Sequence, residues 1–211
     1  MLELAATVLG ILTFLIVNEL WWRRHKIHDE FSRKLVHITV GSFVAFWPFY
    51  LSWTEIELLS IAFLLVVGLS KYLNLFQAIH SVQRPTWGEV FFALAVGTIA
   101  LVTHDQWIYM AAVLQMSLAD GLAAVVGVRF GNSNRYRVFG QDKSVVGTLT
   151  FLVVSIAILV GYSLQAPGVN LSAGLMIGVS LIATLWENIG ILGSDNLLVP
   201  LVVALLLGYA I

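Results

Sequence analysis

The sequence contains no cysteine and few charged residues, and both shortages limit what the protein can be. Without cysteine there is no disulfide framework and no thiolate metal site. Charged residues make up 11 % of the 211 residues, whereas a typical soluble domain has about 25 %. Hydrophobic residues make up 59 %, and the mean hydropathy is +0.92. The composition therefore excludes a soluble globular domain and predicts a protein that sits in the lipid bilayer.

A strong charge of either sign is also missing, because the formal net charge is −1. This balance gives no indication of nucleic-acid binding. We find no internal repeat, no low-complexity tract and no segment with the composition of a soluble domain. We therefore expect residues 1–211 to form a single transmembrane domain.

Apolar segments of membrane length follow one another along the whole chain. Several are shorter than the ~20 residues that cross about 30 Å of hydrocarbon. The pattern predicts an all-α, polytopic helical bundle of about eight transmembrane helices, within a range of seven to nine, with the count open in residues 51–102. The expected spans are Leu2–Trp22, Leu35–Tyr50, Ile56–Leu69, Val90–Val102, Trp107–Val128, Val146–Leu164, Leu171–Trp186 and Leu197–Ile211.

The two ends of the expected spans differ in charge. All 11 lysines and arginines fall in alternate connectors, and the connectors near residues 52–55, 104–106 and 165–170 contain none. The positive-inside rule then predicts a cytoplasmic location for the basic connectors and an N-terminus outside. The first segment has no basic flank before it and no small-residue cleavage site after it, so we expect a retained anchor and not a signal peptide.

Most of the chemically reactive side chains are predicted at the cytoplasmic membrane face. Carboxylates can hold Mg²⁺ while lysine or arginine neutralises phosphate oxygens, so this grouping indicates a metal and phosphate site. The alternative is that they are interfacial charges that anchor helix ends, and we give that role to Arg23, Arg24 and Lys26. The grouped residues are Arg33, Lys34, His37, Arg84, Glu89, Asp120, Lys143, Ser144, Glu187, Asp195 and Asn196.

Asp120 is the most informative of these residues, because it lies inside the apolar stretch Ser117–Gly131. On an unbroken helix it would sit roughly 13 Å deeper in the membrane than Arg129, at 1.5 Å per residue. A carboxylate at that depth is costly unless it is paired, hydrated or coordinated. Gly127 and Gly131 would share its helix face, which also suits close packing of a neighbouring helix. We therefore predict a functional role for Asp120 and leave both roles open for the glycines.

A second candidate segment, Gly140–Phe151, ends a polar loop with Lys143 and Ser144 just before a new span. A helix start beside a lysine is a plausible anion site, although the Walker A pattern does not fit. Lys143 as a snorkelling interfacial residue is the alternative. For Arg135 and Arg137 we expect loop solvation or contact with lipid headgroups.

The order of the motifs resembles a known enzyme family. "RKLVH", "ADGLAAVVGVRFG", "KSVVGT" and a glutamate followed by "DNLLVP" resemble the CTP-dependent lipid-alcohol kinases, namely dolichol kinase, phytol and farnesol kinase, and CTP-dependent diacylglycerol kinase. "RPTWGEVFF" is similar to a motif of phytol-kinase-like members. The resemblance covers about Arg33 to Pro200. It implies phosphoryl transfer from CTP, or another nucleoside triphosphate, to the hydroxyl of a membrane alcohol such as phytol, farnesol, a polyprenol or diacylglycerol.

The resemblance also implies roles for individual residues, with Mg²⁺ as the cofactor. The implied catalytic residues are Asp120, Lys143 and His37. The implied phosphate-binding residues are Arg33, Lys34, Arg84, Gly127, Gly131, Lys143, Ser144 and Gly147. The implied metal ligands are Asp120, Glu187, Asp195 and Asn196. Ser194 departs from the family, whose members often have an acidic residue at this position. The proton of the alcohol would be accepted either by a carboxylate or by His37.

Two other functions fit parts of the sequence. A CTP:phosphatidate cytidylyltransferase also joins a mid-membrane aspartate to a late acidic motif, but its long signature with paired aspartates is absent here. An ion-coupled transporter would use Asp120 and Glu89 as intramembrane substrate or proton sites. No inverted repeat is visible, and the charges cluster at one face instead of the midplane. The oligomeric state, the alcohol and the donor stay open.

Overall fold

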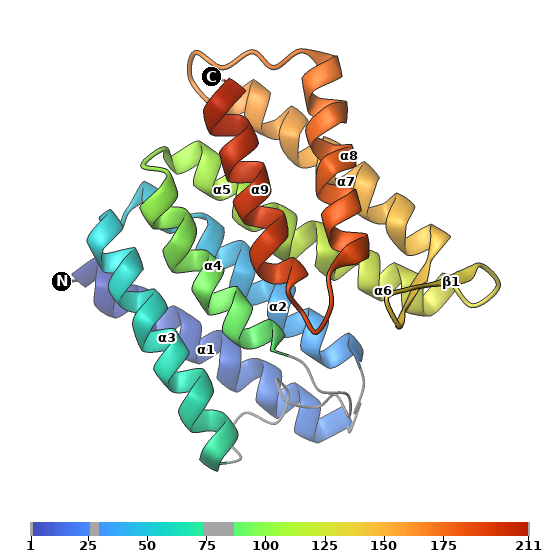
Figure 1. Cartoon of the computed structure of the whole chain (residues 1–211). Helices are drawn as coiled ribbons and strands as arrows, with labels where there is room; N and C mark the ends of the chain where they lie inside the picture. The colour runs from blue at the N-terminus through green and yellow to red at the C-terminus, as the bar shows by residue number, and fades with distance from the viewer. Residues whose placement is uncertain (1, 26–29, 74–86, 211) are drawn as a thin grey trace.

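The structure is a computed structural model that describes residues 2–25, 30–73 and 87–210. Apart from one hairpin, these residues form helices and their connections (Figure 1). The α-helices are α1 (Leu2–His25), α2 (Glu30–Ala45), α3 (Trp53–Leu73), α4 (Gly88–Val102), α5 (Gln106–Leu114), α6 (Asp120–Phe130), α7 (Val145–Gln165), α8 (Ala173–Ile189) and α9 (Asp195–Ala210). The 3-10 helix η1 (Trp47–Phe49) follows α2, and the π-helix η2 (Gln115–Ala119) joins α5 to α6. Because α5, η2 and α6 are continuous, the described chain has eight helical rods, which confirms the predicted all-α bundle.

Three of the described helical segments are long and apolar enough to cross a membrane. They are Leu2–Trp21, Gln106–Phe130 and Val145–Gln165. Shorter apolar helices occupy Gly88–Val102, Ala173–Ile189 and Asp195–Ala210. Large apolar side chains lie exposed on the outside of the bundle, for example on α1 and α3, as expected where lipid replaces water as the solvent.

The predicted spans fail mainly at the polar ends of helices. Helix α2 begins at Glu30 and not at Leu35, so Arg33 and Lys34 are helical residues and not part of a connector. Helix α8 continues to Ile189, which places Glu187 in its last turn instead of the following connector. Hydropathy truncates both helices because these turns carry charge, although the helical hydrogen bonding continues through them.

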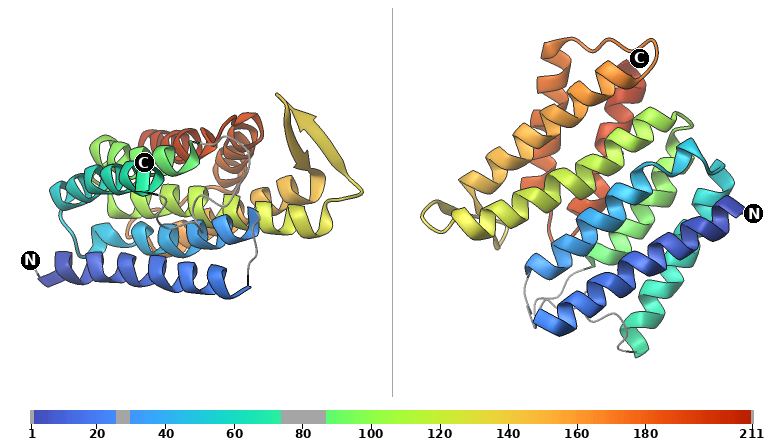
Figure 2. Two further views of the ribbon diagram at one scale, coloured as in Figure 1. Left: turned by 90° about the horizontal axis from the view of Figure 1, so that it is seen from below. Right: turned by 180° about the vertical axis from the view of Figure 1, so that it is seen from behind.

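The expected loop before α7 is an antiparallel hairpin of β1 (Arg135–Val138) and β2 (Gln141–Ser144). It projects at one end of the bundle, away from the N-terminus (Figure 2). The hydroxyl of Tyr136 bonds Thr148 on α7 and Asn188 on α8. These bonds fix the hairpin to the ends of two helices, so its position is set by the bundle.

The π-helix changes which neighbours the small residues of the central rod face. A π turn holds more residues than an α turn, and it rotates the residues that follow. Ser117 packs against Gly41 of α2, whereas Gly127 and Gly131 pack against Ser144 at the start of α7. The small residues of the central rod therefore serve two different helix contacts.

Helix α2 approaches the central rod closely at two glycines. A Cβ atom added to Gly41 would lie under 3.0 Å from Ser117, and one added to Gly121 would lie under 3.0 Å from Ile38. Real Cβ atoms essentially never come so close, so a side chain at either position would force a neighbour to shift. This contact brings the polar end of α2 beside the first turn of α6.

We predict that Gly41→Ala lowers the free energy of unfolding by about 1–3 kcal/mol, because the added methyl group overlaps Ser117 in a packed core. The matched control is Gly161→Ala in α7, where an added Cβ meets no atom within 4 Å. There the gain of up to ~1 kcal/mol in helix propensity is unopposed. Thermal unfolding in detergent micelles measures the stability of both variants. Equal unfolding midpoints for the two variants would contradict the close contact between α2 and η2.

Candidate active site

A cavity of about 310 Å³ lies at the end of the bundle that carries the hairpin. Its walls come from α2, α6, the hairpin, the start of α7, the end of α8 and the start of α9. Segments far apart in the sequence therefore meet in one place. The sequence-predicted site residues in its lining are Arg33, Lys34, Asp120, Gly127, Lys143, Ser144, Gly147, Glu187, Asp195 and Asn196.

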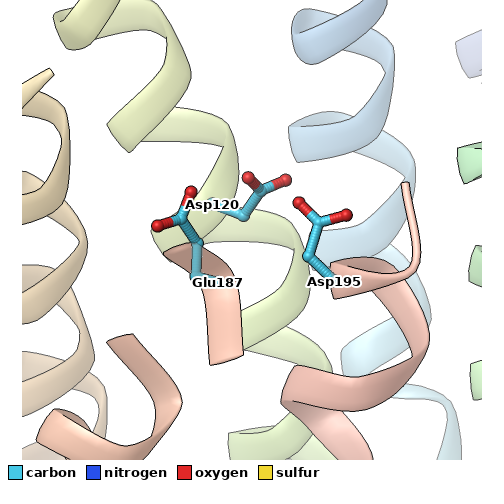
Figure 3. A group of neighbouring side chains, drawn as sticks. All are labelled: Asp120, Glu187 and Asp195. Carbon is cyan, nitrogen blue, oxygen red and sulfur yellow. The ribbon is translucent and has the colours of Figure 1, made fainter. Parts of the chain in front are cut away.

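Three carboxylates from three helices converge in this cavity. Asp120 begins α6, Glu187 is in the last turn of α8, and Asp195 begins α9. One oxygen of each lies within 4.8 Å of the others, and Figure 3 shows the side chains directed toward a common space. Asp120 and Glu187 are buried and Asp195 is half-buried. Like charges this close repel one another, so the group needs cations to be stable.

Two lysines supply part of the compensating charge. The ammonium group of Lys34 bonds Asp120 directly, and both side chains are buried. Lys143 pairs with the carboxylate of Glu187 and also donates to its backbone carbonyl at 2.8 Å. Burial alone would lower the pKa of Lys143, but the carboxylates of Glu187 and Asp195 raise it more, so its pKa lies above the ordinary value. Lys143 therefore stays cationic and is not a snorkelling residue at the surface.

One carboxylate oxygen of this group has no partner. Within the described part of the chain, Oε2 of Glu187 is buried and accepts no hydrogen bond, while Oε1 pairs with Lys143. A buried polar atom without a partner is costly, and such an atom marks a place where a ligand or ion belongs. Opposed oxygen ligands of Mg²⁺ lie about 4.2 Å apart, from bond lengths near 2.1 Å. The donor type and the spacing of the three carboxylates therefore fit a divalent cation.

The loop between α8 and α9 positions Asp195. A Cβ atom on Gly190 would lie 2.6 Å from Cβ of Asp195, so the loop turns back tightly on itself. Leu192 and Gly193 both adopt positive φ angles, 54° and 88°. Ser194 Oγ accepts the backbone N–H of Ile191 at 3.2 Å, so this family departure stabilises the turn.

Asn196 ties α9 to α4, because its amide donates to the carbonyl of Gly88 at 2.9 Å. The amide nitrogen is thereby committed to the fold, although the residue also lines the cavity. The carbonyl of Leu192 accepts the N–H of Trp87 at 2.9 Å in the same region. The structure therefore gives the amide nitrogen of Asn196 a positioning contact, while the residue lines the cavity directly after Asp195.

His37 lies behind Asp120 and not in the lining of the cavity. Its Nε2 donates to the carbonyl of Met116 in the π-helix at 2.8 Å and lies 3.5 Å from Oδ2 of Asp120. The ring packs edge-on against Phe92 at 5.2 Å between centroids. Its Nε2 is thus committed as a donor, and the ring lies beside the aspartate and outside the lining of this cavity.

The small residues at the start of α7 pack helices together. Ser144 Oγ accepts the N–H of Gly147 at 3.1 Å and caps α7. A Cβ on Gly131 would overlap both Ser144 and the carbonyl of Gly127. Gly131 is thus a packing residue outside the lining, whereas Gly127 and Gly147 also line the cavity. The N-terminus of α7 adds partial positive charge near the cavity.

Sequence reasoning missed the contribution of the hairpin. Arg135, Gln141, Asp142 and Thr148 line the cavity, although we expected Arg135 to be solvated or to contact lipid headgroups. Phe139 and Gly140 form a two-residue turn with positive φ angles of 45° and 79°. Such turns mark hairpins, and Gly140 between two short segments was the available signal. Arg84, a predicted phosphate ligand, lies outside the described residues.

Comparison with known proteins finds relatives that are named phytol kinase. Phytol kinase from Synechocystis sp. is 35 % identical over 212 residues, which cover 96 % of this chain and 88 % of the relative. Phytol kinase 1, chloroplastic, from Arabidopsis thaliana is 31 % identical over 202 residues, which cover 85 % of this chain and 66 % of the relative. A probable phytol kinase, chloroplastic, from Triticum aestivum is 28 % identical over 202 residues, which cover 84 % of this chain and 66 % of the relative.

No family model and no solved structure matches the chain. The Synechocystis relative is matched over 96 % of this chain and 88 % of its own length. The chain therefore belongs to the phytol kinase family.

Proposed function

We propose that this protein transfers the γ-phosphoryl group of CTP to the hydroxyl of phytol or a related lipid alcohol in the membrane. The observation that carries the proposal is the convergence of three carboxylates and at least two lysines in one cavity of a phytol kinase family member. Family membership supports the alcohol as acceptor. The motif resemblance supports CTP, with another nucleoside triphosphate as the alternative donor, and farnesol, polyprenol and diacylglycerol as alternative acceptors.

Asp120, Glu187 and Asp195 are the residues that would hold Mg²⁺. When bound, the ion bridges phosphate oxygens and offsets the negative charge that they carry. Oxygen ligands suit this hard cation, and the unpartnered Oε2 of Glu187 is available to it. Asn196 also lines the cavity, and its carbonyl oxygen could add a ligand while its amide nitrogen holds Gly88.

The cationic side chains have a separate task in this proposal. Lys34 and Lys143 line the cavity in contact with Asp120 and Glu187, and Arg33 lines the same space. Donors that are already oriented stabilise charge on the transferring group and the leaving diphosphate without reorganising. Arg135 and Gln141 of the hairpin add polar contacts from the opposite wall. Transfer then depends mainly on positioning and electrostatics.

Neither alternative function is favoured. The relatives described above are kinases by name, and the cavity is lined by α6 together with the hairpin and the adjoining ends of α2, α7, α8 and α9. A transporter site near the midplane is therefore unsupported. The cytidylyltransferase alternative shares the requirement for CTP and metal, so it differs from the kinase in which phosphorus is attacked.

We also propose that the site faces the cytoplasm and that the N-terminus lies outside. In the described chain the basic residues of α2, the hairpin and α6 lie at the end with the cavity, whereas the connectors around Ser52 and Asn170 lie at the other end. The positive-inside rule assigns the basic end to the cytoplasm.

The donor and the reaction are tested together with purified protein in micelles. We expect γ-labelled CTP to place label in phosphorylated phytol, because the lipid hydroxyl attacks the γ-phosphorus. We expect α-labelled CTP to leave the lipid unlabelled and to yield labelled CDP. Label from the α position in a CDP-lipid would establish cytidylyl transfer instead. Parallel reactions with ATP, GTP and UTP identify the preferred donor. Parallel reactions with farnesol, a polyprenol and diacylglycerol identify the preferred acceptor.

Asp120→Asn tests the metal ligands. The amide keeps the size and can still accept the bond from Lys34, but it loses the charge that holds the cation. Activity should fall about 100-fold or more, which is about 2.7 kcal/mol of lost transition-state stabilisation. The control is Asp105→Asn. Asp105 caps α5 at the other end of the bundle, so the variant enzyme should keep its activity. Wild-type turnover of a folded Asp120→Asn protein at saturating Mg²⁺ would remove this aspartate from the site.

The absence of native cysteine allows a clean test of topology. Single cysteines at Ser133 and Ser194 should react with a membrane-impermeant thiol reagent from the cytoplasmic side. Cysteines at Ser52 and Asn170 should react from the opposite side only. Reaction of Ser133→Cys and Ser194→Cys from different sides would contradict a single-faced site, and reaction of both from outside would reverse the orientation.

A further inference from the structure

A second, smaller cavity of about 40 Å³ lies beside the first. Helix α1 packs on α2 and α3 packs on α4, and this cavity lies between the two pairs. Its walls are mainly apolar, with Leu15 from α1, Val36 and Val40 from α2, and Phe63 and Val67 from α3. The polar groups at its edge are Arg33, His37, Glu89 and Asn196. No role in the chemistry described above is assigned to Glu89 or to this cavity.

The two cavities are joined by shared residues. Arg33 and Asn196 line both. Asn196 follows Asp195 of the carboxylate group directly, and its amide holds the carbonyl of Gly88, the residue before Glu89. His37 makes a second connection, because it lines the small cavity while its Nε2 lies 3.5 Å from Asp120. A group seated in the small cavity is therefore next to the carboxylates.

The size and character of the small cavity restrict what it can hold. It has room for about three water-sized groups, from roughly 10–15 Å³ for each. That matches the oxygen and first carbons of a chain, but not a whole long hydrocarbon. The helices that frame it, α1 and α3, expose leucine, isoleucine and valine outside, for example Leu9 and Leu65 at 64 % each. A long apolar tail can thus continue along the outer surface in lipid.

We propose that this cavity binds the hydroxyl end of the acceptor alcohol and that Glu89 is its proton acceptor. The inference rests on the proposed kinase function. Among the described residues that line the cavity, Glu89 is the sole carboxylate. Glu89 is in the first turn of α4 and half-buried, at the polar edge where a hydroxyl would sit. His37 also lines the cavity, and its Nε2 is committed as a donor to the carbonyl of Met116.

The reaction balances without any further reagent. The hydroxyl oxygen forms a bond to the γ-phosphorus of the nucleotide in the large cavity. The bond from that phosphorus to the β–γ bridging oxygen breaks, and its electron pair leaves with the nucleoside diphosphate. The hydroxyl proton passes to the carboxylate of Glu89 and then to water.

Photo-crosslinking locates the alcohol without requiring turnover. The probe is a C20 isoprenoid alcohol with a diazirine close to its hydroxyl, added to the full chain in micelles. We expect cross-links on α2, α3 and α4 among the lining residues, and competition by unlabelled phytol. Cross-links confined to other helices would overturn the inference even if phosphate transfer is observed. If no phosphate is transferred but the cross-links fall here, the proposed function fails while this binding site stands.

Two neighbouring valines provide a matched pair for kinetics. Val67 is 3 % exposed and lines the cavity, whereas Val66 is 42 % exposed on the outer side of α3. Val67→Phe should raise KM for the alcohol about tenfold and leave KM for the nucleotide unchanged, since only acceptor binding loses space. Val66→Phe should change neither. Equal effects of Val67→Phe on both substrates would contradict a separate acceptor cavity.

Glu89→Gln tests the proton acceptor. Removal of a general base typically costs about 100-fold or more in kcat. We expect that loss with unchanged Mg²⁺–CTP binding, measured by the shift in thermal unfolding, and partial recovery in Glu89→Asp. Glu57→Gln, in the first turns of α3 at the opposite end of the bundle, is the control. An undiminished kcat of the Glu89→Gln variant would show that Glu89 is not the proton acceptor.

Discussion

The burial of the Asp120 carboxylate within an apolar helix is the constraint on which the rest of the structure depends. A lone carboxylate in that position costs several kcal/mol or more, so the fold must bring partners to it. The direct bond from Lys34 meets this need, and His37 and the cations of the cavity add to it. Lys34 can reach the aspartate only because α2 lies very close to the central rod at Gly41 and Gly121. The charge, the glycines and the π-helix therefore form one arrangement.

The same requirement for compensating charge applies to the large cavity, where α2, α6, the hairpin, α7, α8 and α9 meet. Each buried carboxylate carries its own cation or open oxygen: Asp120 has Lys34, and Glu187 has Lys143 and one free oxygen. The hairpin is fixed to α7 and α8 through Tyr136, which holds Lys143 in register with Glu187. Because negative and positive groups are already set in place, a metal ion and a polyphosphate can bind with little rearrangement. The neighbouring apolar cavity then lets a lipid acceptor approach from within the bilayer.

The sequence predicted the all-α bundle because long apolar segments are a strong signal for membrane helices. It pointed to Asp120 because a carboxylate inside such a segment is costly unless it is paired or coordinated. It also grouped Glu187 and Asp195 with Asp120, which the fold indeed places together. It missed the β-hairpin, whose signal was the turn at Gly140, and it could not predict the π-helix, which produces no hydrophobic period of its own. Nor could it show that Ser117 packs against α2 while Gly127 packs at the start of α7. The positioning contacts of Asn196 and His37 depend on distant segments and leave no local pattern.

The central claim is that Asp120, Glu187 and Asp195 hold the divalent cation that accompanies the nucleotide. The most direct measurement is an anomalous-scattering map of crystals grown with Mn²⁺ and a non-hydrolysable CTP analogue. If these carboxylates hold the cation, a Mn²⁺ peak will lie among them, at about 2.0–2.3 Å from oxygens of at least two of them. The triphosphate will then lie on the same peak, within reach of Lys143. A bound nucleotide whose metal lies away from all three side chains would contradict the account.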